Sequence, residues 1–125
     1  MANILMVDDG ALITSWLTEI LRREGYEVEI ARDEKQALRI YKPHLHQLII
    51  TDLRLPDGIE MMAELLHRSP FAQILAIVGG ELVQPESVLN TATIFGSVRI
   101  LRKPFSLATF LRTVQEQLAH GIDGA

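Results

Sequence analysis

Five short apolar runs recur along the chain at fairly even spacing, and most are too short to be helices. They are residues 3–7 (NILMV), 26–30 (YEVEI), 47–51 (QLIIT), 73–78 (QILAIV) and 98–101 (VRIL). Most of the runs are rich in Ile, Val and Leu, which is typical of strands buried on both faces of a sheet. Residues 26–30 alternate more between apolar and polar side chains, so we expect this strand nearer an edge of the sheet.

The segments between the runs carry apolar residues three and four positions apart, the spacing of an amphipathic helix. The first segment puts its apolar residues on one face and ends at Gly25, because glycine suits a helix end. That face comprises Leu12, Ile13, Trp16, Leu17, Ile20 and Leu21. In the second segment, Asp33 and Gln36 have the spacing of a capping box, and Pro43 follows the helix that they open.

Three further helices are predicted in the rest of the chain. Two methionines mark the third and are expected on or beside its core face. The fourth opens near Pro85 and closes at Gly96, and Ser106 is placed to cap the fifth. The apolar residues are Met61, Met62, Leu65 and Leu66 in the third helix, Val88, Leu89 and Ala92 in the fourth, and Leu107, Phe110, Leu111, Val114 and Leu118 in the fifth.

The pattern is therefore a strand followed by a helix, five times over, without a long linker, repeat or low-complexity segment. Strands that alternate with helices indicate an α/β fold, a doubly wound (βα)5 arrangement with a five-stranded parallel sheet and helices on both faces. Right-handed crossovers leave few topologies, and we expect the flavodoxin-like strand order 2-1-3-4-5. The length of 125 residues suits a single domain over residues 1–125.

Composition narrows the class of protein. Apolar residues make up 48% of the chain, enough for an ordinary core, and the net charge of −4 argues against direct nucleic-acid binding. The absence of cysteine excludes disulfides, thiolate metal sites and cysteine nucleophiles. The sequence contains no run long enough to span a membrane and no secretory signal pattern. We therefore expect a soluble cytoplasmic protein without a membrane partner.

Charged side chains stand where three of the five runs end. Asp8 and Asp9 follow the first run, Asp52 the third and Lys103 the fifth. Ligands of open parallel sheets bind at the carboxyl ends of the strands, so we expect the three carboxylates to share one crevice with the lysine. Carboxylates this close together need a cation or coupled protons. An all-oxygen site suits Mg²⁺, and Asp52 is then placed to accept a phosphoryl group.

Three motifs at these strand ends resemble one known family. VDD after the first strand, TDLRLPDG after the third and RKPF after the fifth are similar to the receiver domain of bacterial two-component response regulators, the CheY-like superfamily. The resemblance covers roughly residues 3–119, the expected core of the domain. It implies a signalling domain that catalyses only its own phosphorylation and dephosphorylation. It also implies a histidine kinase or a phosphotransfer protein as the partner that supplies the phosphoryl group.

The resemblance assigns each of these residues a role. Asp52 is the expected phosphoacceptor, and Lys103 is expected to contact the phosphoryl group. The expected ion is Mg²⁺ or Mn²⁺, and no other cofactor is implied. The residues matched to the metal site are Asp8, Asp9, Asp52 and Arg54, the last through its backbone carbonyl. The Lys103–Pro104 peptide bond is expected to be cis, because proline lowers the cost of that isomer.

Two positions depart from the family's pattern. The family relays phosphorylation through a Ser or Thr at the end of the fourth strand and an aromatic residue on the fifth, where this chain has Val78 and Ile100. Valine has the shape of threonine without its hydrogen-bonding oxygen, so we expect the usual readout to be weakened or rerouted. The alternative function is a receiver-like interaction module that phosphorylation does not regulate. A flavin-binding or hydrolytic enzyme has no supporting motif.

Partner surfaces are implied mainly by the resemblance. Receivers commonly use the fourth helix, the fifth strand and the fifth helix to contact a target, and Arg99 and Ile100 lie on the expected fifth strand. We therefore expect an unidentified target or output domain at this surface, with a homodimer as one option.

Two histidines and the tryptophan lie outside these motifs, and we expect none of the three to have a role in the site. His44 and His46 are expected to be surface residues of a loop rather than metal ligands, because no third ligand has a suitable spacing. Trp16 is expected to contribute to packing rather than to function.

Overall fold

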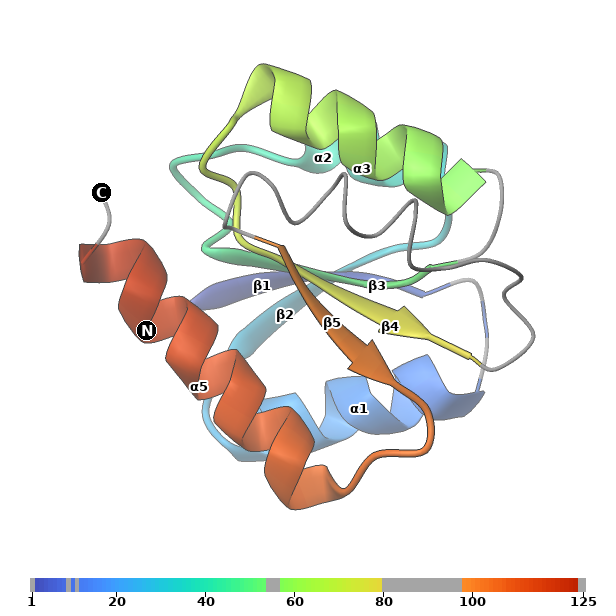
Figure 1. Cartoon of the computed structure of the whole chain (residues 1–125), viewed down its shortest axis with the longest axis vertical. Coiled ribbons are helices and arrows are strands. Elements are labelled where there is room, and N and C mark those ends of the chain that lie inside the picture. Colours follow the sequence, from blue (N-terminus) through green and yellow to red (C-terminus); the bar gives the residue numbers. More distant parts are fainter. Residues whose placement is uncertain (1, 9, 11, 54–56, 80–97, 124–125) are drawn as a thin grey trace.

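The computed structural model describes residues 2–8, 10, 12–53, 57–79 and 98–123 (Figure 1). Five parallel strands form one sheet in the order β2-β1-β3-β4-β5, which confirms the predicted flavodoxin-like order. The strands are β1 (Asn3–Val7), β2 (Glu27–Ala31), β3 (Leu48–Asp52), β4 (Ile74–Val78) and β5 (Val98–Arg102). Each strand lies within one residue of its predicted run at both ends, and β2 is an edge strand as its alternation indicates.

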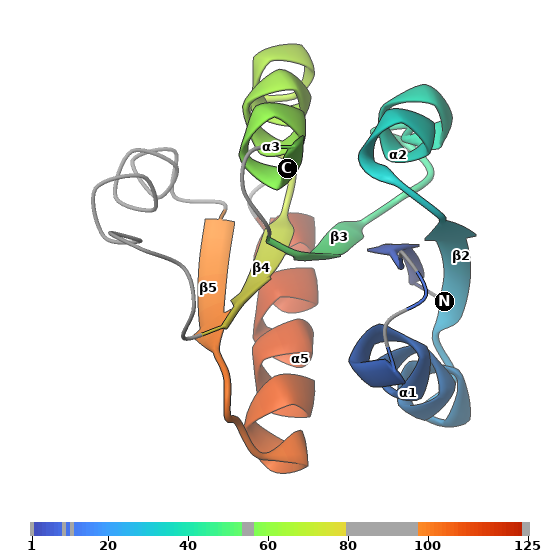
Figure 2. The same cartoon turned by 90° about the vertical axis from the view of Figure 1, so that its right-hand side faces the viewer.

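Helices cover both faces of the sheet in the described part of the chain (Figure 2). α1 and α5 pack on one face, and α2 and α3 pack on the other. They are α1 (Leu12–Arg23), α2 (Glu34–Ile40), α3 (Asp57–Arg68) and α5 (Leu107–Asp123). The predicted fourth helix, with Val88, Leu89 and Ala92 between Pro85 and Gly96, lies outside the described residues. Within those residues, no helix is long and apolar enough to cross a bilayer.

The sheet separates two hydrophobic cores, because successive side chains of a strand point to opposite faces. On β1, Leu5 packs in the core under α2 and α3, whereas Ile4 packs in the core under α1 and α5. Met61 and Met62 of α3 are 1% and 2% exposed, which confirms their predicted place in the core. Burial on both faces explains why most of the strands appear in the sequence as unbroken apolar runs.

The prediction for α1 is confirmed at Leu17 and Leu21, which are fully buried in the core, but it is wrong at Leu12 and Trp16. Leu12 is 88% exposed and Trp16 is 54% exposed, so Trp16 does not pack in the core, whereas Thr14 and Thr18 are buried. The Thr18 hydroxyl donates to the backbone carbonyl of Thr14 at 2.8 Å, and the Thr14 hydroxyl donates to Asp8. Because both hydroxyls have partners, the threonines can be buried without an unsatisfied polar group.

Local hydrogen bonds begin two of the helices where the sequence predicts. Asp33 accepts a hydrogen bond from the backbone N–H of Gln36 at 2.8 Å and caps α2. The Gln36 side chain accepts from the N–H of Arg32 at 2.7 Å, one residue before the position that a capping box uses. The Ser106 hydroxyl accepts from a backbone N–H in the first turn of α5 at 3.0 Å. Gly25 has a φ of +96°, a left-handed conformation that favours glycine after a helix.

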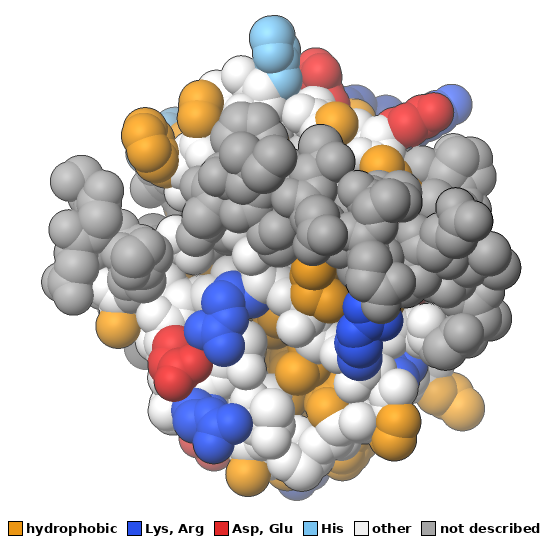
Figure 3. Space-filling model, in the orientation of Figure 1, with side chains coloured by type: hydrophobic (Ala, Val, Ile, Leu, Met, Phe, Trp, Pro, Cys, Tyr) orange, Lys and Arg blue, Asp and Glu red, His pale blue; other side chains and the backbone are white. Residues whose placement is uncertain are grey.

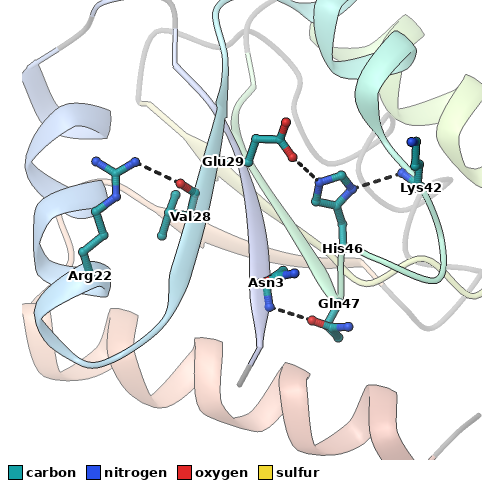
Figure 4. A network of polar contacts seen from close by, with 7 residues as sticks. All are labelled: Asn3, Arg22, Val28, Glu29, Lys42, His46 and Gln47. Carbon is teal, nitrogen blue, oxygen red and sulfur yellow. Dashed lines mark hydrogen bonds and ion pairs between the residues drawn. The ribbon is translucent and has the colours of Figure 1, made fainter.

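A polar network joins β2 to the loop before β3 (Figure 4). His46 is 4% exposed; its Nδ1 accepts from the backbone N–H of Lys42 at 3.0 Å, and its Nε2 lies 2.7 Å from Glu29 Oε1. Because Nδ1 is an acceptor, Nε2 carries the hydrogen and donates a hydrogen bond to the Glu29 carboxylate. The predicted surface position is therefore wrong for His46, whereas His44 is exposed as expected.

Candidate functional site

Charged residues meet where the sheet's strands end. Val7 of β1 and Thr51 of β3 are partners on adjacent strands, so Asp8, directly after β1, and Asp52, the last residue of β3, come next side by side. Lys103 directly follows β5, and its backbone N–H donates to the carbonyl of the last residue of β4 at 2.9 Å. Since β3, β4 and β5 are consecutive in the sheet, the acids and the lysine come to one edge.

Lys103 and Asp52 form a close ion pair at this edge. Lys103 Nζ donates to Asp52 Oδ2 at 2.8 Å. The Asp52 side chain is 8% exposed and the Lys103 side chain is 28% exposed. A carboxylate this far from water needs a charged partner, because desolvation disfavours its ionised form. The two residues are 51 positions apart in the sequence, so the contact depends on the order of the strands.

Three hydrogen bonds hold the Asp8 carboxylate. Its Oδ1 accepts from the backbone N–H of Gly10 at 2.9 Å and from the Thr14 hydroxyl at 2.5 Å. Its Oδ2 accepts from the Ser15 hydroxyl at 3.1 Å. Gly10 has a φ of +97°, a conformation that other residues rarely adopt, and the chain turns there so that its N–H reaches back to Asp8.

Sequence reasoning missed Thr14 and Ser15 as members of this site. The available signal was a pair of adjacent hydroxyl residues in the first turn of the helix that follows the acids. Helical periodicity did not reveal them, because it assigned the apolar residues Leu12 and Trp16 to the buried side.

The described part of the site carries more negative than positive charge. Asp8 is 8% exposed, and the carboxylates of Asp8 and Asp52 are accompanied by the single ammonium group of Lys103. This all-oxygen donor set fits Mg²⁺, which binds one or two carboxylates and keeps several waters. Within the described residues, no group of three or more His, Cys, Asp or Glu side chains is arranged to hold a metal ion. Asp9 and Arg54, the other expected ligands, lie outside those residues.

The remaining predicted positions lie on or beside β4 and β5. Val78 is the last residue of β4 and is fully buried, and Ile100 of β5 is partly buried; both pack in the core under α2 and α3. The peptide bond between Lys103 and Pro104 is cis.

Comparison with known proteins identifies the family. The model of the response regulator receiver domain matches residues 4–115 of the chain. The transcriptional regulatory protein PdtaR of Mycobacterium tuberculosis is 32% identical over 116 residues, which cover 90% of this chain and 55% of that protein. The chain therefore spans about half the length of this curated relative.

Solved structures of similar fold cover all or nearly all of the chain. A CheY-like response regulator receiver domain protein from Methanospirillum hungatei has a TM-score of 0.84 at 25% identity and covers 100% of this chain and 99% of that one. The response regulator TrrA from Thermotoga maritima, solved in complex with Mg(2+)-BeF, has a TM-score of 0.75 at 24% identity and covers 94% of this chain and 99% of that one. With its five-stranded sheet, its charged strand ends and a family match over nearly its full length, the chain belongs to the response regulator receiver domain family.

Proposed function

We propose that this receiver domain is a phosphoacceptor whose Asp52 takes a phosphoryl group from the phosphohistidine of a histidine kinase or a phosphotransfer protein. The observation that carries the proposal is the 2.8 Å contact between Lys103 Nζ and Asp52 Oδ2 at the carboxyl edge of the sheet. Buried acids are costly, and a domain that only binds a partner has no physical need for them at this edge. We further propose that residues 1–125 form one receiver domain with its core at residues 3–119.

Asp52 supplies the nucleophile in the proposed reaction. One of its carboxylate oxygens forms a bond to phosphorus while the bond from phosphorus to the donor's imidazole nitrogen breaks, and that nitrogen keeps the electron pair. Lys103 holds Oδ2 and so orients the acceptor carboxylate. Its ammonium group also lies beside the position where the transferred oxygens collect negative charge, which lowers the energy of the transition state.

Asp8 and Asp52 are the described residues that would hold Mg²⁺, and we propose that Asp9 and the Arg54 carbonyl complete the ligand set. When bound, the ion supplies positive charge that offsets the acids and the phosphoryl oxygens. The excess of carboxylates over ammonium groups supports this assignment, as does the Mg(2+)-BeF complex of TrrA. Mn²⁺ prefers the same oxygen ligands and should substitute for Mg²⁺.

A mass measurement tests the phosphoacceptor proposal. The protein is incubated with Mg²⁺ and acetyl phosphate, and we expect a mass increase of one phosphoryl group that is stable in acid and lost in base. Asp52→Asn should show no increase, because an amide is a poor nucleophile. Asp33→Asn is the matched control: Asp33 is exposed at the start of α2, and asparagine caps a helix equally well, so its labelling should equal that of the wild type. Absence of the adduct with both acetyl phosphate and a cognate kinase would contradict the proposal.

We also propose that this domain reads out phosphorylation in an atypical way. Val78, fully buried at the end of β4, has no hydroxyl to donate to a phosphoryl group, and Ile100 has no aromatic ring. A hydrogen bond to an anion is worth roughly 1.5–3 kcal/mol, so its loss from the active state changes a two-state ratio about 10- to 100-fold. Val78→Thr should therefore enlarge the phosphorylation-dependent chemical-shift changes in an NMR spectrum. Identical changes in the two proteins would refute this idea.

A receiver-like interaction module that phosphorylation does not regulate is the second candidate, and the residues at positions 78 and 100 favour it. The candidate surface is the face of β5 and α5, where Arg99 Nη1 lies 3.0 Å from Glu116 Oε1 and other Arg side chains are exposed (Figure 3). We propose that this face, together with the fourth helix, contacts a target, an output domain or a second copy of the chain. If Asp52→Asn and phosphorylated wild type bound a partner equally well, the second candidate would be favoured.

A further inference from the structure

We propose that the hydroxyls of Thr14 and Ser15 are positioning groups that leave Asp8 one oxygen for a cation and thereby make the site selective for Mg²⁺ over Ca²⁺. The inference rests on the proposed function, because it concerns the same metal site. Its starting point is an arrangement that the family motifs do not include: the first turn of α1 directs two side-chain hydroxyls at the Asp8 carboxylate.

The hydroxyls of Thr14 and Ser15 use acceptor positions of the Asp8 carboxylate that a cation would otherwise bind. An ionised carboxylate offers about four lone-pair positions, two on each oxygen. Oδ1 of Asp8 accepts from Gly10 N–H and from Thr14, so both of its positions are used. Oδ2 accepts from Ser15, which leaves one position among the contacts of the described residues. A cation, or a water bound to it, can therefore use Oδ2, whereas bidentate binding would require Oδ1 as well.

This restriction distinguishes the two alkaline-earth ions. Mg²⁺ demands near-octahedral geometry at about 2.0–2.1 Å and binds few carboxylates. Ca²⁺ takes about 6–8 oxygen ligands at about 2.3–2.6 Å and readily accepts both oxygens of one carboxylate. The Thr14 hydroxyl occupies Oδ1 together with the Gly10 N–H, and the Ser15 hydroxyl on Oδ2 helps to fix the orientation of the carboxylate. These contacts remove an option that Ca²⁺ uses and Mg²⁺ does not need.

The position of Thr14 suits it for this role. The residue is 1% exposed on the face of α1 that packs on the sheet, and its branched side chain has few rotamers. Ser15 is exposed and makes the longer bond, 3.1 Å against 2.5 Å, so its contribution should be smaller. Thr18 lies four residues further along α1 and is 3% exposed, but its hydroxyl donates to a backbone carbonyl instead of to Asp8. It is therefore a matched control.

Isothermal titration calorimetry of the full chain with MgCl2 and, separately, with CaCl2 tests the proposal. Thr14→Val should lower the Mg²⁺ affinity about 10-fold, at the lower end of the effects seen when groups that orient a metal ligand are removed. The Ca²⁺ affinity should fall less, so the ratio of the Mg²⁺ to the Ca²⁺ affinity decreases. Thr14→Ser should restore both the affinity and the ratio, because it keeps the hydroxyl. Ser15→Ala should act in the same direction with a smaller effect, and Thr18→Val should change neither affinity.

The possible outcomes separate this inference from the proposed function. An unchanged affinity ratio in Thr14→Val overturns the inference, including when both affinities fall equally, which is the result that a loosened helix would produce. Urea unfolding shows whether each variant is folded. If Thr14→Val does not fold, Ser15→Ala provides the same test at an exposed position. If the wild type binds Mg²⁺ and becomes phosphorylated but Thr14→Val keeps the full selectivity for Mg²⁺ over Ca²⁺, the inference is refuted and the proposed function stands. Wild type that binds neither ion overturns both.

Discussion

Two polar clusters lie toward opposite ends of the strands, and they differ in how their charges are balanced. In the cluster near the amino ends of β1 and β3, His46 donates to Glu29 and accepts from Lys42, and it stacks on Tyr41 with ring centroids 5.9 Å apart. Both ring nitrogens thus have protein partners, and the Glu29 side chain is 52% exposed, so its charge is hydrated as well. This cluster is complete without a ligand.

The cluster at the carboxyl ends is not balanced in the same way. Among the described residues, Asp8 has three hydrogen-bond donors and Asp52 pairs with Lys103, and the two buried carboxylates exceed the positive charge of that lysine. In a poorly hydrated site, such an excess is costly until a cation compensates it. The comparison shows that burial and hydrogen bonding alone do not mark a functional site. What distinguishes the second cluster is the excess of carboxylates over ammonium groups among its described residues, which favours the binding of a cation.

The largest expected effect is a loss of stability at the His46 cluster, which would show that this cluster contributes to folding and not to phosphorylation. His46→Ala removes the acceptor of the Lys42 N–H and opens a cavity beside Tyr41, so it should lower the free energy of unfolding by about 3 kcal/mol. Phosphorylation of Asp52 in the folded protein should continue. Urea unfolding followed by circular dichroism measures the change. His44→Ala, at an exposed position in the same loop, should stay within about 0.5 kcal/mol of the wild type; equal losses in the two variants would contradict the assigned role.

A smaller effect is expected at the charged cluster. Lys103→Met leaves the Asp52 carboxylate without its ammonium partner and should lower the free energy of unfolding by about 2 kcal/mol, less than for a fully buried pair because Lys103 is partly exposed. Added Mg²⁺ should recover part of this loss, since a bound ion stabilises the folded state. Lys35→Met, at an exposed position of α2, should show neither effect. If Mg²⁺ recovered the His46→Ala loss equally well, the distinction between the clusters would fail.

The smallest expected effect is a gain in stability beside the charged cluster. Thr51 precedes Asp52 on β3 and is fully buried, and its hydroxyl has no hydrogen-bond partner among the described residues. Thr51→Val keeps the shape and removes this unsatisfied group, so the free energy of unfolding should rise by about 1 kcal/mol. Thr113→Val is the matched comparison: the buried Thr113 hydroxyl donates to the carbonyl of Thr109 at 2.8 Å, so its loss should bring no gain. Equal changes in the two variants would show that the unsatisfied hydroxyl has no energetic consequence.

The strands and their order could be predicted because each strand is short, apolar and bounded by polar residues. Those properties are local, and the rules for parallel sheets convert them into a topology. The caps at Asp33 and Ser106 were likewise predictable, since each bonds a backbone group within three residues of itself. The contact between Lys103 and Asp52 follows from the strand ends once the order is known.

The side of α1 that faces the sheet could be predicted only in part: Leu17 and Leu21 are buried as their spacing indicates, but the burial of two threonines was not predicted. Thr14 and Thr18 are buried because their hydroxyls find an Asp8 oxygen and a backbone carbonyl, and hydrophobic periodicity carries no information about such partners. The burial of His46 could not be predicted for a similar reason. Its burial depends on Glu29, 17 residues earlier on a different strand, so no spacing within the loop indicates it.

The exposed side of α1 has a practical consequence for spectroscopy. Trp16 is the chain's one tryptophan, and its indole is already half in water in the native fold. Its fluorescence should therefore shift in wavelength only modestly when the chain unfolds, which makes it a weak reporter of denaturation. By the same property, any molecule that covers this side of α1 should shift the emission to the blue without the need for a label.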